Sequence, residues 1–277
     1  MSLAAMGWGL FLFAGAAGIG VAASLPAPDV QQIVQRSEQA IVEDWNQAPK
    51  YSYVERDVES KRDGQPTVKT YQVVMIDGSP YNRLIAINDK PLSSADQAQE
   101  VRKLQAEMRR REQESPRERQ KRIEKYQRER HQDNALLKGM VSAFDFRQMG
   151  EETVNGRTCW VLDATPKPGY APSSRETKVL AGMRGRLWID EASGQWVKVQ
   201  AEVFQPVSLY GFIAKVHPGT SFTLEQEPVA PHLWLPKHFV THVSASALGF
   251  INENSIDDET YSNYKPMGET LSELITR

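Results

Sequence analysis

Short runs of alternating apolar and polar residues, separated by turn residues, limit the folds open to this chain more than any other feature. The stretch 185–203, GRLWIDEASGQWVKVQAEV, holds two such runs on either side of Ser193-Gly194. Alternate residues of a β-strand point to opposite faces of a sheet, and glycine supplies the positive φ that tight hairpin turns require. The stretch therefore predicts two antiparallel strands with one apolar face and one polar face.

Strict alternation decides which residues of this stretch share the apolar face. Trp196 is expected on the opposite, polar face. The residues expected on the apolar face are Leu187, Ile189, Val197, Val199, Ala201 and Val203. This face must cover either a closed protein core or a ligand.

Similar runs occur along most of the chain. Three lie between residues 51 and 87, and the pattern returns from residue 144 to about residue 264. Asn155-Gly156 is the strongest hairpin signal among them. Connections this short cannot form the crossovers of a parallel sheet. The sequence predicts about ten or eleven antiparallel strands.

Helices are expected in two places. Apolar residues from Asp29 to Trp45 recur at helical spacing after Pro28, which predicts an N-terminal helix. A helical insertion is expected over about residues 93–140, where Ser115-Pro116-Arg117-Glu118 has the form of a capping box. Between Glu100 and Asp133 the chain has twelve Lys and Arg against eight Asp and Glu. Apolar residues are sparse there, so we expect helices with a narrow docking stripe and a broad charged face. This charged face is either simply solvated or forms a basic lid that contacts anionic head groups or a partner.

The first 23 residues differ from the rest of the chain. No charged side chain occurs from Leu3 to Ala23, and the segment ends in a small-x-small pattern typical of signal peptidase cleavage. We expect a signal peptide over residues 1–23 and a single periplasmic domain over residues 24–277. An uncleaved N-terminal membrane anchor is the alternative, because about 20 apolar residues can span a bilayer.

Composition and motifs argue against several other classes of protein. The net charge of −2 and the charged fraction of 25% describe an ordinary surface rather than a nucleic-acid binder. The single cysteine, Cys159, lies in a strand-like run and is expected to be a small buried residue. His238 and His242 are four residues apart on an expected strand, about 13 Å, which is too far to hold one metal ion. No nucleophile or metalloprotease motif occurs, so we expect no enzyme, no metal and no cofactor.

Three stretches resemble proteins of the LolA/LolB-like superfamily, which carry lipoproteins or lipids to the outer membrane. They are NGRTCWVLDATPK (Asn155–Lys167), RLWIDEASGQWVKVQAEV (Arg186–Val203) and LWLPKHF (Leu233–Phe239). The resemblance implies an α+β fold, mainly β: an unclosed antiparallel β-barrel with an N-terminal helix and an inserted helical lid. It implies a periplasmic, non-enzymatic carrier for a lipid, an acyl chain or a lipoprotein.

The concave face of such a barrel would hold the ligand. We expect it to be lined by Leu187, Ile189, Val197, Val199, Val203, Phe222, Leu224 and Phe239. Expected partners are a lipid or acylated protein and an anionic membrane surface, which Arg109, Arg110 and Arg111 would contact; no nucleic acid is expected. The alternative is a periplasmic sensing or interaction protein of the same fold, which contacts a membrane or protein through its basic helices.

Overall fold

The computed structural model describes residues 29–61, 65–174, 176–208, 214–247, 251–268 and 270. The expected signal peptide lies outside the described residues. Within these ranges no helix is both long enough and apolar enough to cross a bilayer.

Thirteen strands form one antiparallel sheet in the order β4-β3-β2-β1-β13-β12-β11-β8-β7-β6-β5, with β10 and β9 attached beside β12. The strands of the first half are β1 (Tyr51–Lys61), β2 (Thr67–Ile76), β3 (Ser79–Ile87), β4 (Lys90–Pro91), β5 (Phe144–Val154) and β6 (Arg157–Pro166). Those of the second half are β7 (Met183–Asp190), β8 (Trp196–Val203), β9 (Val207–Ser208), β10 (Ala214–Val216), β11 (Ser221–Ala230), β12 (Leu233–Ala247) and β13 (Ile251–Pro266).

The predicted fold class is confirmed. The sheet ends in β4 on one side and β5 on the other, so it is unclosed. It has more strands than predicted because β4, β9 and β10 are only two or three residues long. Such short segments carry no recognisable alternation.

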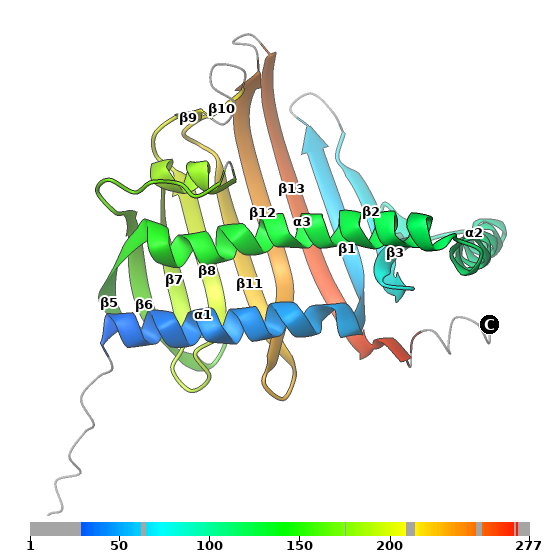
Figure 1. The fold of residues 1–277 in the computed structure, drawn as a ribbon, viewed down its shortest axis with the longest axis horizontal. Coiled ribbons are helices and arrows are strands. Elements are labelled where there is room, and N and C mark those ends of the chain that lie inside the picture. Colours follow the sequence, from blue (N-terminus) through cyan, green and yellow to red (C-terminus); the bar gives the residue numbers. More distant parts are fainter. Residues whose placement is uncertain are drawn as a thin grey trace, which may run out of the picture.

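Two helices cross one face of the curled sheet, which we call the concave face (Figure 1). They are α1 (Val30–Gln47) and α3 (Pro116–Ala143). The helix α2 (Ser94–Glu112) packs beside β3 near the other end of the sheet. Two short 3-10 helices, η1 (Ala48–Lys50) and η2 (Glu176–Gly182), also lie in the described ranges. The insertion therefore contributes one helix across the concave face and one at the edge.

The start of α3 follows the sequence signal. The Glu118 N–H donates to Ser115 Oγ (3.4 Å), and the Ser115 N–H donates to Glu118 Oε2 (2.9 Å), which makes a complete capping box. Two of the N–H groups left without partners at a helix start are thereby satisfied.

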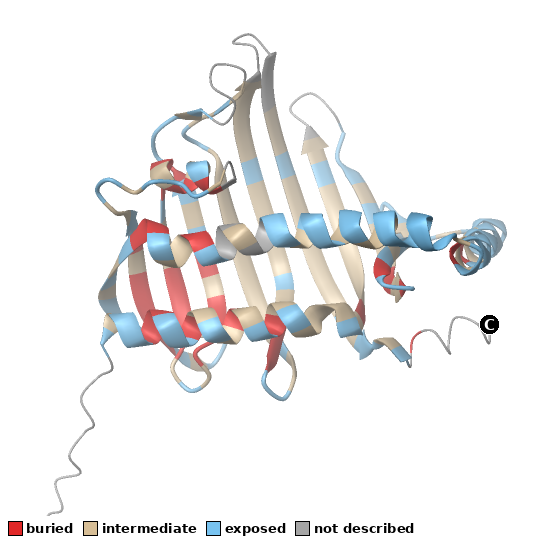
Figure 2. Ribbon diagram, in the orientation of Figure 1, coloured by how far each residue is buried: buried red, intermediate tan, exposed pale blue. Residues whose placement is uncertain are grey.

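Burial is uneven along the sheet. Buried residues concentrate in β6 to β8, beneath α1 and the C-terminal part of α3, whereas β12, β13 and β1 are mostly half-buried (Figure 2). The main hydrophobic core joins Ile33, Val34 and Ile41 of α1 to the concave face of β6, β7 and β8. The helices therefore seal one half of the concave face far better than the other.

Arg111 fastens α2 to the hairpin of β2 and β3. Its side chain is buried and donates to the backbone oxygens of Ile76 (2.6 Å), Ser79 (2.8 Å) and Pro80 (3.1 Å). Its Nε donates to Glu107 Oε1 at 2.6 Å. The predicted surface contact is therefore wrong for Arg111, because this guanidinium binds backbone oxygens of its own chain.

Replacing Arg111 with Met should destabilise the protein by about 3 kcal/mol or more, because the buried carbonyls of Ile76 and Ser79 lose their donor. The matched control is Arg109→Met, since Arg109 is exposed on the same helix. This control should change stability by less than about 0.5 kcal/mol. Urea unfolding midpoints measure both, and equal small effects would contradict the structural role of Arg111.

Candidate ligand-binding cavity

A row of small residues crosses three adjacent strands on the concave face. Ala164 of β6 pairs with Gly185 of β7, which pairs with Ala201 of β8. Residues paired across antiparallel strands point to the same face, so these three positions form one continuous strip. Large residues fill the neighbouring row, in which Leu162 pairs with Leu187 and Leu187 with Val199. The small row therefore leaves a hollow between the sheet and the helices.

This hollow is a partly open cavity with about 40 Å³ of space for the centres of water-sized molecules. The helices supply Val34, Ser37 and Glu38 from α1, Met140 and Val141 from α3, and Leu180 from η2. The sheet supplies Phe144, Phe146, Ala164, Met183, Gly185, Leu187, Ile189, Trp196, Val199, Ala201 and Phe222. Almost all of these side chains are apolar.

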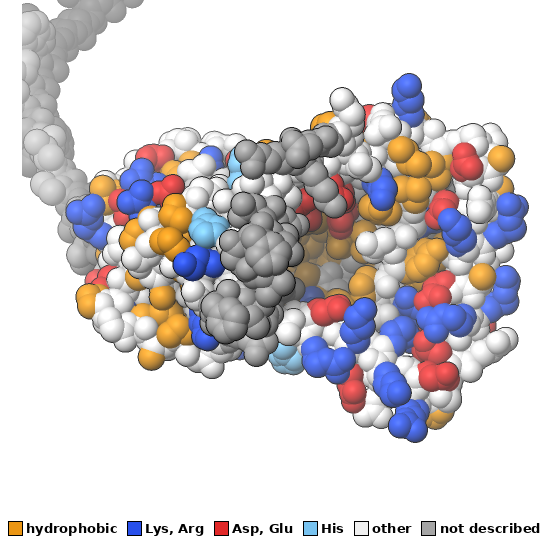
Figure 3. Space-filling model, turned by 90° about the horizontal axis from the view of Figure 1, so that it is seen from above, with side chains coloured by type: hydrophobic (Ala, Val, Ile, Leu, Met, Phe, Trp, Pro, Cys, Tyr) orange, Lys and Arg blue, Asp and Glu red, His pale blue; other side chains and the backbone are white. Residues whose placement is uncertain are grey.

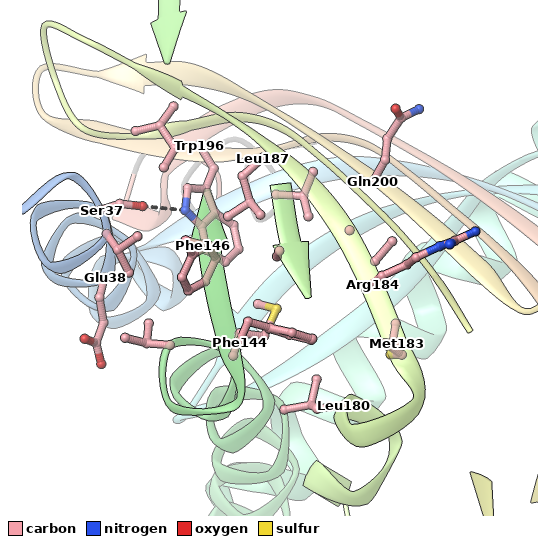
Figure 4. A pocket seen from close by; sticks show the side chains of 18 of the residues that line it. Ser37, Glu38, Phe144, Phe146, Leu180, Met183, Arg184, Leu187, Trp196 and Gln200 are labelled. Carbon is pink, nitrogen blue, oxygen red and sulfur yellow. Dashed lines mark hydrogen bonds between the residues drawn. The ribbon is translucent and has the colours of Figure 1, made fainter. Parts of the chain in front are cut away.

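Gly185 lets β7 and β8 approach each other closely at the floor of the cavity. A Cβ at this position would lie 2.7 Å from the backbone oxygen of Gln200 and 3.2 Å from Ala201 Cβ. With no side chain here, the cavity reaches down to the backbone of β7 and β8. The side chains of Arg184 and Gln200, which flank this point, extend away from the cavity (Figure 4).

Trp196 connects the sheet to α1. A register shift between Trp188 and Ile189 pairs Ile189 with Trp196, so Trp196 faces the cavity. Its indole N–H donates to the hydroxyl of Ser37, which is buried on α1 (Figure 4). The expectation that Trp196 would lie on the polar face is therefore wrong, because a β-bulge breaks strict alternation.

The same bulge moves Val197 to the opposite, convex face. Val197 is buried there with Cys159, Val161, Trp188 and Trp234. The expected place of Val197 on the concave face is corrected accordingly. Cys159 is fully buried, as predicted, and burial raises the pKa of its thiol to about 11, which disfavours the reactive thiolate.

The other expected ligand-binding residues lie on the concave face. Leu187, Ile189, Val199 and Phe222 line the cavity. Val203 and Leu224 belong to the core around it. Phe239 packs against Phe222, with ring centroids 6.1 Å apart. The small row and the helix residues of the cavity are not recognisable in the sequence, because their proximity depends on strand pairing and helix docking.

The concave face becomes acidic beyond Phe239. Phe239 pairs with Glu259, which pairs with Asp57, so the apolar row continues into carboxylates. Figure 3 shows a hollow with hydrophobic and acidic side chains in its walls. Burial, together with Glu259 and Asp57, raises the pKa of Glu55 to about 7. An apolar ligand is therefore better accommodated between β5 and β11 than near β1 and β13.

The histidine pair is not arranged for metal binding. His238 Nε2 lies 2.9 Å from Asp258 Oδ1, on the convex face. Within the described ranges, no group of three or more His, Cys, Asp or Glu could hold an ion together.

Asp44 is a buried acid that sequence analysis also missed. It lies on the docked side of α1, three residues after Ile41, and is 3% exposed. Both carboxyl oxygens are buried without a hydrogen bond of normal geometry from the described residues. Burial raises its pKa to about 7; the nearby Gln195 side chain and Trp234 N–H offset this effect only in part. Its signal in the sequence is an acidic residue within the apolar stripe of a helix.

No protein-family model matches this chain, and no curated protein matches its sequence. Solved structures of the LolA superfamily resemble its fold. A LolA superfamily protein from Nitrosomonas europaea is 11% identical, with 86% of this chain and 94% of that chain covered and a TM-score of 0.33. An outer membrane lipoprotein-sorting protein domain from Vibrio parahaemolyticus is 9% identical, with 84% and 92% covered and a TM-score of 0.33. The MucA/MucB complex of Pseudomonas aeruginosa contains a chain 12% identical, with 86% and 99% covered and a TM-score of 0.23.

Asp44→Asn should change how stability depends on pH. The pKa of Asp44 in the folded state lies above its ordinary value of 3.8, so the folded protein binds more protons than the unfolded chain between those values. Stability of the wild type should therefore fall as pH rises towards 7 and level off above it. Between about pH 5 and pH 8 the variant should gain roughly 2–3 kcal/mol relative to the wild type.

Other carboxylates with a raised pKa also make the free energy of unfolding depend on pH. The informative quantity is therefore the difference in this free energy between the variant and the wild type at each pH. Chemical unfolding across this pH range measures it. The control is Glu43→Gln, an exposed change on the same helix, whose pH profile should run nearly parallel to that of the wild type. A parallel profile for Asp44→Asn would contradict a buried, neutral Asp44.

Proposed function

We propose that this protein is a non-enzymatic carrier that holds an acyl chain of a lipid or lipoprotein in the cavity between α1, α3 and β5 to β8. The observation that carries the proposal is the row Ala164, Gly185 and Ala201, which leaves an apolar hollow where larger side chains would make a closed core. The carrier needs no cofactor and would act in the periplasm, after export directed by residues 1–23.

The driving force is desolvation. Each methylene that leaves water for an apolar site contributes about 0.8 kcal/mol, so a chain of several methylenes suffices for measurable binding. The cavity walls offer few hydrogen-bonding groups, and Ser37 already accepts from Trp196. Recognition would therefore depend on the length and shape of the apolar chain.

Filling the cavity tests the proposal. Ala201→Leu adds a branched side chain to the floor and should lower affinity for a fluorescent fatty-acid probe at least tenfold. The melting temperature should stay the same or rise, because added apolar atoms fill empty space. Gln200→Leu makes the same kind of change on the exposed opposite face and should leave affinity unchanged.

Val199→Thr offers an independent test by polarity. It keeps the branched shape but places a hydroxyl in the wall, at a cost of roughly 1–3 kcal/mol when an acyl chain covers it. Probe affinity should then drop about tenfold, with little change in the unfolding midpoint, because an empty cavity lets water reach the hydroxyl. Gln200→Thr is the control. A large loss of stability without a loss of affinity would mean that the hollow is ordinary core.

Native mass spectrometry of protein purified without detergent separates this proposal from an interaction protein of the same fold. Co-purified lipid supports the carrier. A protein that is empty and binds no fatty-acid probe supports the alternative.

A further inference from the structure

The outer face of α3 carries a line of cations. Arg117, Lys121, Lys125 and Arg128 recur at intervals of three or four residues, so they follow one side of the helix over about 16 Å. All four are exposed, and Glu124 is the acidic residue on the same side. We call these four residues the cationic stripe.

The opposite side of α3 is fixed to the protein. Arg122 donates to Glu114 (2.7 Å) and to Ser79 Oγ (2.7 Å), and Ile123 lies over the β2–β3 turn. Arg130 donates to the Trp45 oxygen of α1 and stacks on the Trp45 ring, 4.5 Å from its centroid. These contacts set the rotation of the helix, so the cationic stripe must project away from the sheet.

The stripe is poorly neutralised by the protein itself. Among the described residues, Lys125 has a loose ion pair with Glu129 (3.8 Å), and Arg117, Lys121 and Arg128 have none. Two of the arginines that the sequence predicted to contact a membrane are less available than the stripe. Arg111 is buried, and Arg110 is already paired with Glu107 (2.7 Å) and Glu114 (3.0 Å). Lys and Arg gather over the helical arm beside the hollow in Figure 3.

We propose that the cationic stripe of α3 docks on an anionic lipid surface and so presents the cavity to the membrane. The inference rests on the proposed function, because the C-terminal end of the same rigid helix, at Met140 and Val141, forms a wall of the cavity.

The chemistry of the stripe favours a bilayer over a protein partner. The exposed residues from Arg117 to Gln132 include no Phe, Tyr, Trp or aliphatic side chain. Protein interfaces are centred on buried apolar or aromatic residues and are depleted in lysine. Evenly spaced cations instead suit a fluid array of phosphate groups, where each Lys or Arg contributes about a factor of five to partitioning.

Vesicle co-sedimentation tests the inference. The full mature protein should bind vesicles that contain phosphatidylglycerol but not vesicles of phosphatidylcholine alone, and added salt should release it, since exposed charges are screened within about 8 Å. Combining Arg117→Gln, Lys121→Gln and Arg128→Gln should lower partitioning by about a hundredfold. The matched control combines Lys90→Gln, Arg102→Gln and Lys215→Gln, which removes the same charge from exposed sites elsewhere.

The control should lower partitioning less than tenfold. An equal loss in both triple variants would overturn the inference, because net charge and not the stripe would then govern binding. Absence of binding to anionic vesicles would overturn it as well and leave an acidic protein as the partner. Fatty-acid affinity measured without vesicles should be the same in the wild type and both variants. If the wild type binds no fatty acid, the carrier function is contradicted and not the membrane contact of the stripe.

Discussion

The fold depends on how the inner face of an unclosed sheet is kept from water. A closed barrel would cover this face by its own curvature. Here β4 and β5 are free edges of the sheet, and α1 and α3 cover the concave face. The helix α1 is held by the indole of Trp196 on Ser37 and by Arg36, which donates to the backbone of the β7–β8 turn. Exposed apolar area costs roughly 25 cal/mol per Å², so the position of these helices decides which part of the face is core and which part is cavity.

The two halves of the concave face have opposite chemistry along the same cross-strand rows. From β6 to β11 the rows are apolar, and at β13 and β1 they become carboxylates and tyrosines. Burial raises the pKa of Glu55, Glu259 and Tyr261, so this acidic half disfavours charge and offers little to an apolar chain. The boundary at Phe239 thus limits the cavity to the half that α1 and the end of α3 cover.

Alternation along the sequence was sufficient to predict the longer strands and the antiparallel sheet, and a capping box predicted the start of α3, because these depend on local patterns. It failed at Trp196 and Val197, where a single bulge exchanges the two faces. It also failed at Arg111, since a run of three arginines does not reveal that carbonyls of β2 and β3 surround one of them. The cavity itself was not predictable, because Ala164, Gly185 and Ala201 belong to three strands and become neighbours only through strand register.

Photo-crosslinking with a diazirine-bearing fatty acid, followed by peptide mapping, tests the central claim most directly. Labelling should concentrate on peptides of β7, β8 and α1, at residues such as Leu187, Val199 and Val34, and an excess of unlabelled fatty acid should suppress it. Labelling confined to the convex face around Trp188 and Trp234, or insensitive to competitor, would contradict an acyl-binding cavity on the concave face.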